Sequence, residues 1–186
     1  MRKLQLATLI LLSGALAWAA PSSAKLASTC ASVVHAQGFL APDGTKVALA
    51  DYAAGRPLAV VVIKGHWCPA CTDQLRTLSK KLKTVRATGG DVIALSTEDA
   101  GTNEMIMRKH GLRFPVLGEP SAALLERLGF WWPEMGHPMP GLIFLDRCGD
   151  VTKRVFGRRP GWSQDEIIID VLRDLAKQPA TCGWDA

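Results

Sequence analysis

The sequence is short of several features that mark specialised proteins. Aromatic residues make up only 6% of its 186 residues, no segment repeats, and there is no low-complexity stretch. Charged residues reach 21%, an ordinary share for a globular chain, which excludes a wholly disordered protein. The net charge of +5 is a modest surplus, and no aromatic or glycine-rich binding motif accompanies the basic run at residues 80–86. We therefore expect a single globular domain that does not bind nucleic acid.

One long apolar segment is present, and it lies at the N-terminus. Leu4–Ala20 carries no charge, follows a short basic start, and precedes small residues at positions 22 and 24. This layout predicts a secretory signal peptide over residues 1–24, with cleavage after Ala19 as the other option. An uncleaved membrane anchor is the alternative, although about 17 apolar residues are at the short limit for a span. Cys30 lies too far along the chain for a lipid anchor.

Removal of the signal peptide changes the composition that matters. It leaves 162 residues, a net charge of +3 and all five cysteines. We expect the mature protein in the periplasm or another extracytoplasmic compartment, where disulfides persist, and without stable membrane insertion.

The mature chain alternates between strand-like and helix-like patterns. The apolar runs at 58–63 and 91–96 suit strands buried on both faces of a sheet, and apolar residues from 71 to 85 recur at helical spacing. Further elements are expected as a hairpin at 38–49, a helix at 103–110, an extended piece at 114–117, a helix at 121–128, a hairpin at 141–155 and a last helix from Ser163. The order predicts an α/β domain over residues 38–178, with a lead-in at 25–37 and a tail at 179–186. Its central mixed sheet would have parallel strands, an antiparallel edge hairpin and helices on both faces.

Cys68 and Cys71 are the sharpest chemical feature. They lie where the strand at 58–63 gives way to a helix, and Pro69 suits the first helical position. At such an N-terminus, unpaired N–H groups and the helix dipole favour a thiolate at Cys68. Cys71 lies about one turn on, on the apolar helix face, within reach of the first sulfur. An exposed reactive thiol with a shielded partner is what thiol–disulfide exchange requires.

Other chemistries for this pair are open. The pair could be half of a zinc or Cu(I) site completed by His66 or His137, but no second Cys-x-x-Cys or paired histidines follow. Haem attachment would need a histidine where Thr72 stands. A purely structural disulfide would close only a very short loop. We predict a redox pair with no metal and no cofactor.

The segment from Val62 to Leu75, with Trp67-Cys-Pro-Ala-Cys71 at its centre, resembles the redox turn of the thioredoxin superfamily. It is most similar to the peroxiredoxin-like (AhpC/TSA, redoxin) branch. Weaker landmarks follow in the family's order over about residues 38–176, namely Asp43–Leu49, Phe114–Leu117 and Pro140–Asp146 with Gly149.

The resemblance implies a thioredoxin fold with a cis-proline facing the cysteine pair. Pro140 is the candidate, and a cis bond there would expose backbone groups of Met139 to a substrate strand. An ordinary trans proline is the alternative. Trp67 and Pro140 would shape the site, and Trp131 and Trp132 lie in an apolar loop that either docks substrate or folds onto the core.

Departures from the family bear on the reaction. The family's peroxidatic sites carry a Pro-x-x-x-Thr-x-x-Cys pattern and a later arginine. Aligned here, Cys71 takes the peroxidatic position, Cys68 replaces the threonine, Lys64 replaces the proline, and the arginine position falls near Pro140. The resemblance to thioredoxin would also place a buried carboxylate where Val62 stands. Lys64 or His66 could then assist proton transfer.

Three cysteines remain outside the redox pair. A thioredoxin fold implies a Cys148–Cys182 disulfide, which would leave Cys30 as the odd thiol. Cys30–Cys182 is the rival pairing.

We therefore expect an exported, monomeric thiol–disulfide oxidoreductase in which Cys68 attacks and Cys71 resolves. Its partners would be protein thiols or disulfides and a redox partner. A thiol-dependent peroxidase with Cys71 as the attacking sulfur is the first alternative, and a Cu(I)- or zinc-binding protein is the second.

Overall fold

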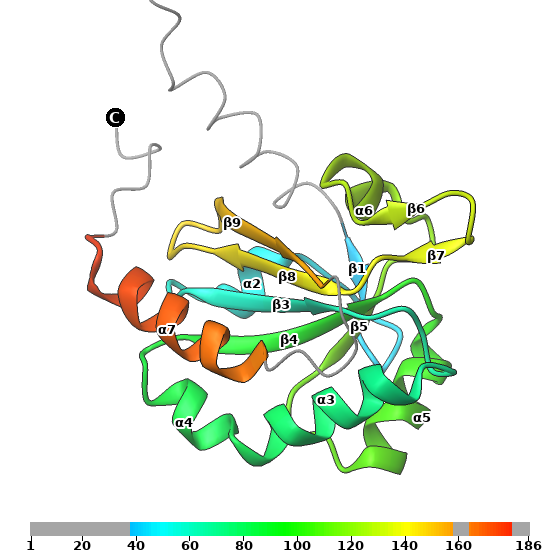
Figure 1. The fold of residues 1–186 in the computed structure, drawn as a ribbon, viewed down its shortest axis with the longest axis horizontal. Coiled ribbons are helices and arrows are strands. Elements are labelled where there is room, and N and C mark those ends of the chain that lie inside the picture. Colours follow the sequence, from blue (N-terminus) through cyan, green and yellow to red (C-terminus); the bar gives the residue numbers. More distant parts are fainter. Residues whose placement is uncertain (1–37, 158–163, 180–186) are drawn as a thin grey trace, which may run out of the picture.

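A seven-stranded sheet forms the centre of the molecule (Figure 1). The computed structural model describes residues 38–157 and 164–179. The sheet order is β2-β1-β5-β4-β3-β8-β9. The strands are β1 (Phe39–Leu40), β2 (Lys46–Val47), β3 (Leu58–Val62), β4 (Asp91–Ser96), β5 (Val116–Gly118), β8 (Gly141–Leu145) and β9 (Val151–Phe156). The predicted N-terminal signal peptide and lead-in lie outside the described residues.

The middle of the sheet is parallel and its edges are antiparallel. β3 pairs with β4 in parallel, from Leu58↔Asp91 to Val62↔Leu95, and β4 pairs with β5 in the same sense. β8 runs antiparallel to β3 and continues into the β8–β9 hairpin, while β1 and β2 form the other edge. All five residues of β3 are buried, which is why its sequence is continuously apolar rather than alternating. The mixed sheet predicted from the sequence is confirmed.

Helices cover both faces of the sheet. One face packs against α3 (Pro69–Lys80), α4 (Leu82–Arg86), α5 (Ala100–His110) and α7 (Gln164–Lys177). The other face packs against the short helices α2 (Leu49–Ala53) and α6 (Ala123–Arg127). Alternate residues of β3 serve the two cores, because Ala59 and Val61 belong to the first cluster and Val60 and Val62 to the second. The predicted layer arrangement is therefore confirmed.

Two helices differ locally from the expected elements. The helix predicted through residue 85 is interrupted at Lys81, whose backbone leaves the helical range and whose side chain forms an ion pair with Asp165 of α7. The helix expected from residue 103 begins at Ala100, because the Asp99 side chain accepts a hydrogen bond from Thr102 N–H and caps it.

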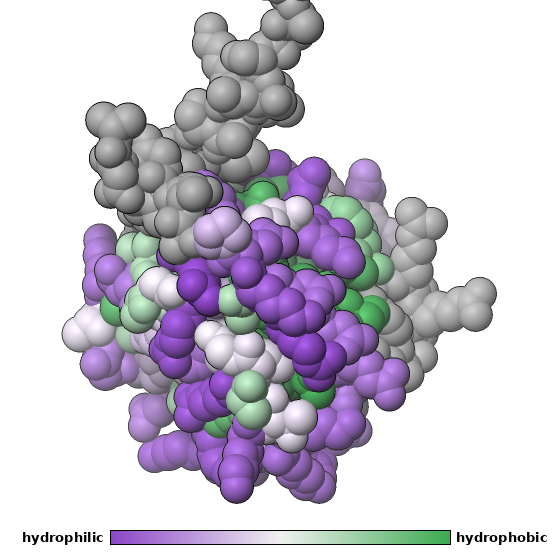
Figure 2. Space-filling view, turned by 90° about the vertical axis from the view of Figure 1, so that its left-hand side faces the viewer, coloured by the Kyte–Doolittle hydropathy of each residue, from purple (hydrophilic) through white to green (hydrophobic). Residues whose placement is uncertain are grey.

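A small second sheet is also present. It pairs β6 (Trp131–Trp132) with β7 (His137–Pro138), which the sequence pattern does not reveal because each strand has only two residues. Across the described residues, no helix is long and apolar enough to span a membrane. The face of the molecule turned to the viewer in Figure 2 is mainly hydrophilic.

The packing of α3 against the sheet leads to a stability prediction. Leu75 is fully buried in the core that joins α3 to the sheet. Leu75→Ala should lower the free energy of unfolding by about 3 kcal/mol through lost burial and the cavity left behind. Leu75→Met, which keeps the volume, should cost less than about 1.5 kcal/mol. Urea unfolding of the reduced and oxidised protein measures both values, and equal losses for the two variants would contradict this packing.

Candidate redox site

The cysteine pair lies at the junction of β3 and α3, as the sequence predicts. β3 ends at Val62, the loop 63–67 crosses the sheet edge, and Cys68 takes the N-cap position of α3 with an extended backbone. Pro69 occupies the first helical position, where a missing N–H costs nothing. The Cys68 N–H donates to the Gly65 carbonyl at 3.2 Å, so the loop turns tightly before the helix.

Cys68 and Cys71 form a disulfide, with their Cα atoms 5.3 Å apart. Both residues are buried, at 8% and 4% exposure, so the expectation of an exposed Cys68 with a shielded partner is wrong for this disulfide form, in which Cys68 is only slightly the more accessible. The backbone N–H of Cys71 donates to the Cys68 sulfur at 3.3 Å. This contact and the positive end of the helix dipole stabilise negative charge on that sulfur once the disulfide is reduced.

Glu98 anchors the loop that precedes the pair, and sequence reasoning did not single it out. Its Oε1 accepts from the His66 backbone N–H at 3.1 Å and lies 2.8 Å from His66 Nδ1. The carboxylate presses against Gly65, where an added Cβ would lie 2.6 Å from Oε1 and 2.7 Å from the Trp67 ring nitrogen. Only glycine leaves room for this approach. The sequence gives no sign of this contact, because Glu98 is more than thirty residues away from His66 in the chain.

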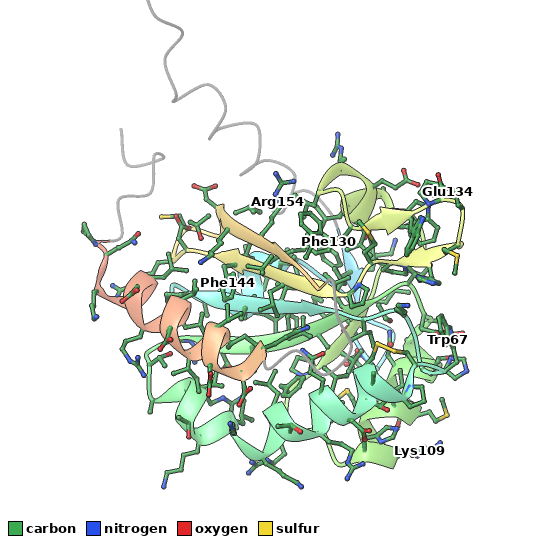
Figure 3. All side chains as sticks on the ribbon, viewed as in Figure 1. Trp67, Lys109, Phe130, Glu134, Phe144 and Arg154 are labelled. Atoms are coloured by element: carbon green, nitrogen blue, oxygen red, sulfur yellow. A yellow bond between two sulfur atoms is a disulfide. The ribbon has the colours of Figure 1, made fainter. Side chains whose placement is uncertain are left out.

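An aromatic cluster borders the pair on the side of the small second sheet. The Trp67 ring lies 5.3 Å from the His137 ring, and the Trp132 ring lies 6.2 Å from the same His137 ring. Trp67 and Trp132 are 53% and 43% exposed, and Met135 is 56% exposed. Figure 3 places Trp67 on the same edge of the molecule as Glu134 of the β6–β7 turn. The sheet edge beside the disulfide therefore carries an exposed apolar surface.

Comparison with known proteins identifies the family. The AhpC/TSA family model matches residues 33–154, which is most of the domain. The chain belongs to the AhpC/TSA family. Peroxiredoxin Bcp of Escherichia coli K12 is 24% identical over 140 residues, covering 72% of this chain and 88% of that protein. Peroxiredoxin Q of Oryza sativa subsp. japonica chloroplasts is 26% identical over 87 residues, 47% of this chain and 40% of the relative.

Solved structures share the fold. A Xanthomonas campestris peroxiredoxin Q structure matches with a TM-score of 0.69 at 16% identity, over 78% of this chain and 95% of that one. Mycobacterium tuberculosis BcpB matches with a TM-score of 0.66 at 14% identity, over 74% and 92% of the two chains. The protein is thus a thioredoxin-fold AhpC/TSA oxidoreductase, and the expected resemblance is confirmed.

The cis-proline expected from the resemblance is absent. No described peptide bond is cis, so the bond between Met139 and Pro140 is trans. The Met139 N–H donates to the Phe130 carbonyl at 2.7 Å, and the Pro140 carbonyl accepts from Gly157 N–H at 2.8 Å. These bonds continue the β7 and β8 ladders through residues 139 and 140, and the Met139 N–H is already paired. The prediction that a cis bond presents it to a substrate strand was wrong.

The remaining predicted site residues lie in the loop after β3 and in the small second sheet. Trp131 is half-buried opposite Pro138 in the small sheet, and Lys64 is half-buried in the loop after β3. His137 is 8% exposed, with Nδ1 2.9 Å from the Pro138 carbonyl. Among residues 38–157 and 164–179, no three His, Cys, Asp or Glu side chains are grouped to hold a metal. The metal-binding alternative therefore gains no support from the described residues.

Cys148 lies in the β8–β9 turn and is disulfide-bonded. Its backbone N–H donates to the Asp146 carboxylate at 2.8 Å. Cys30 and Cys182 lie outside the described residues, so the pairing of Cys148 with Cys182 stays a prediction.

Crowding at Gly65 can be tested directly. Gly65→Ala should push Glu98 and Trp67 away from the loop, and we expect the rate of disulfide reduction by dithiothreitol to change at least about threefold, a shift of about 0.7 kcal/mol. Gly44→Ala is the matched control, because that glycine also has a positive φ but nothing within 4 Å of its added Cβ. Stopped-flow tryptophan fluorescence follows both variants. Equal rates in wild type and Gly65→Ala would show that the close approach is not needed.

Proposed function

We propose that this protein is a thiol-dependent peroxidase in which Cys71 attacks peroxide and Cys68 resolves the product. The observation that carries the proposal is the Cys68–Cys71 disulfide. The spacing of the sequence pattern aligns Cys71 with the family's peroxidatic cysteine. Relatives named peroxiredoxin, matched over most of the domain, support the same chemistry.

The proposed cycle balances with one external reductant. The Cys71 thiolate attacks the terminal oxygen of a hydroperoxide, the O–O bond breaks, and the alkoxide or hydroxide that leaves takes up a proton from solvent to give an alcohol or water. Cys71 is then a sulfenic acid, which the Cys68 thiol attacks to release water and form the disulfide. A dithiol partner returns two electrons and two protons to restore both thiols.

Helix geometry supports a thiolate at either sulfur. Cys71 lies in the first turn of α3, where the dipole and unpaired N–H groups favour negative charge. In the alignment with the family's pattern, Lys64 and Cys68 stand at the proline and threonine positions, and the arginine position falls near Pro140. We therefore expect slower peroxide reduction than in a family member with the full set, because fewer groups polarise the O–O bond.

Disulfide exchange with protein substrates is the second candidate, and two observations favour it. The Cys71 N–H points at the Cys68 sulfur, and Cys68 is the more exposed cysteine beside an exposed Trp67. In this reaction the Cys68 thiolate attacks a substrate disulfide, one substrate sulfur leaves as a thiolate, and Cys71 then displaces the other. The oxidised pair and a reduced substrate result.

We also propose that the protein works outside the cytoplasm. The basic, apolar and small-residue layout of residues 1–24 supports export. Five cysteines in a mature chain of 162 residues suit an oxidising compartment. Fractionation of cells that express the full chain, with N-terminal sequencing of the product, tests cleavage after Ala24 or Ala19.

Single cysteine variants distinguish the two sulfurs in peroxide reduction. Peroxide consumption in excess dithiothreitol should fall at least about a hundredfold in Cys71→Ser, because the attacking sulfur is gone. It should persist in Cys68→Ser, since dithiothreitol reduces the sulfenic acid directly. Ala70→Ser adds a hydroxyl to the same turn at an exposed position and serves as the control. Loss in Cys68→Ser with retention in Cys71→Ser would contradict the proposal.

The second candidate has its own measurement. If exchange is the main activity, insulin reduction by the dithiol form should be lost in Cys68→Ser. Wild-type activity no greater than that of Cys68→Ser would exclude this candidate and leave peroxide reduction unaffected.

A further inference from the structure

We propose that Glu98 is a positioning residue for the redox pair and acts through His66. The proposal rests on the use of Cys68 and Cys71 in thiol chemistry and holds for either reaction above. Glu98 would fix the loop in front of Cys68 and hold the His66 imidazole in the form that favours a thiolate at Cys68.

Glu98 is itself rigidly held. Its backbone N–H donates to the Ser96 hydroxyl at 3.1 Å, and its carbonyl accepts from the Asn103 side chain at 3.2 Å. The Ser96 hydroxyl donates to Asn103 Oδ1 at 2.7 Å, and both of these residues are fully buried. Gly118 of β5 allows this arrangement, because an added Cβ there would lie 2.4 Å from the Glu98 carbonyl oxygen. Hydrogen bonds from the end of β4 and from α5 thus hold the backbone of Glu98 in a fixed position.

That carboxylate makes two contacts with a single residue of the redox loop. Both the backbone N–H and Nδ1 of His66 lie within hydrogen-bond distance of Oε1. A carboxylate only accepts hydrogen bonds, so the contact selects an imidazole with its proton on Nδ1. In the neutral ring, Nε2 is then the nitrogen without a proton. The side chains of His66 and Glu98 are 48% and 20% exposed, so the imidazole is in contact with solvent.

His66 and Cys68 belong to the same tightly folded loop. Consecutive Cα atoms are about 3.8 Å apart, so the Cα atoms of these two residues are at most about 7.6 Å apart. The Cys68 N–H to Gly65 carbonyl bond folds the loop and shortens that path. Proton uptake at Nε2 gives an imidazolium held by the Glu98 carboxylate on one side. Its positive charge favours the thiolate that forms when a dithiol reduces the disulfide.

Other titratable groups also face this loop in the part of the chain that the structure describes. Lys64 lies on the same loop, and His137 of β7 reaches it through the Trp67 ring. The sulfur of Cys68 lies at the C-terminal end of this loop, at the start of α3. Direct repulsion between the Glu98 carboxylate and a thiolate would act in the opposite direction to the effect through His66. The sign of the Glu98→Gln effect therefore distinguishes the two.

The test measures thiolate formation rather than turnover. Reduced full-length protein is treated with iodoacetamide across a pH range from about 5 to about 9, and adduct on Cys68 is quantified by peptide mass spectrometry. Glu98→Gln keeps the acceptor oxygen but removes the charge. We expect about tenfold slower alkylation of Cys68 near neutral pH, with the curve moved by about one pH unit to higher pH. Glu104→Gln, an exposed acid on α5, is the matched control and should match wild type.

A double-mutant cycle shows whether the effect passes through His66. In a His66→Asn background, Glu98→Gln should change alkylation less than about twofold. An equal effect with and without His66, an unchanged curve, or faster alkylation in Glu98→Gln would each overturn the proposal. Wild-type ¹⁵N NMR adds a check that needs no variant, because a neutral His66 with its proton on Nε2 would also overturn it. Alkylation involves neither peroxide nor a disulfide substrate. A protein without peroxidase activity could therefore still show the expected effect of Glu98→Gln, and the two proposals can fail independently.

Discussion

The N–H group of Cys71 donates to the sulfur of Cys68, and the site depends on the arrangement that makes this contact possible. The same N–H also donates to the Cys68 carbonyl at 3.1 Å, and a donor shared in this way belongs to the first turn of a helix, so the pair lies where α3 begins. The start of α3 is fixed by β3, which is buried on both faces. β3 pairs with β4 on one side and with β8 on the other. The central strand therefore holds the reactive turn at a constant place on the sheet edge.

A polar group of residues and an apolar group of residues meet at this edge of the sheet. On one side, at the end of β4, the buried Ser96–Asn103 pair holds the backbone of Glu98 by hydrogen bonds. Next to it, Trp67 of the redox loop and Trp132 and Met135 of the β6–β7 hairpin are exposed apolar side chains. The polar side is suited to controlling proton position, and the apolar side is suited to contact with a substrate or reductant.

The local parts of this site could be predicted from the sequence. A β-branched apolar run, a proline after the first cysteine and apolar residues at helical spacing are short-range signals, and they placed the disulfide at the correct junction. Glu98 could not be predicted, because its partner His66 is far away in the chain and a loop glutamate is ordinary in isolation. The expectation at Pro140 failed for a related reason, since the hydrogen bonds that keep residues 139 and 140 in the ladders come from Phe130 and Gly157. The ion pair of Lys81 with Asp165, at the point where α3 ends and α4 begins, also joins residues that are far apart in the chain.

The central claim concerns which sulfur meets peroxide first. Reduced Cys68→Ser protein mixed with one equivalent of hydrogen peroxide and then dimedone tests it most directly, with the adduct located by peptide mass spectrometry. The account predicts a dimedone adduct on Cys71 that grows with the loss of peroxide. No adduct on Cys71 in this variant, together with an adduct on Cys68 in Cys71→Ser, would contradict it.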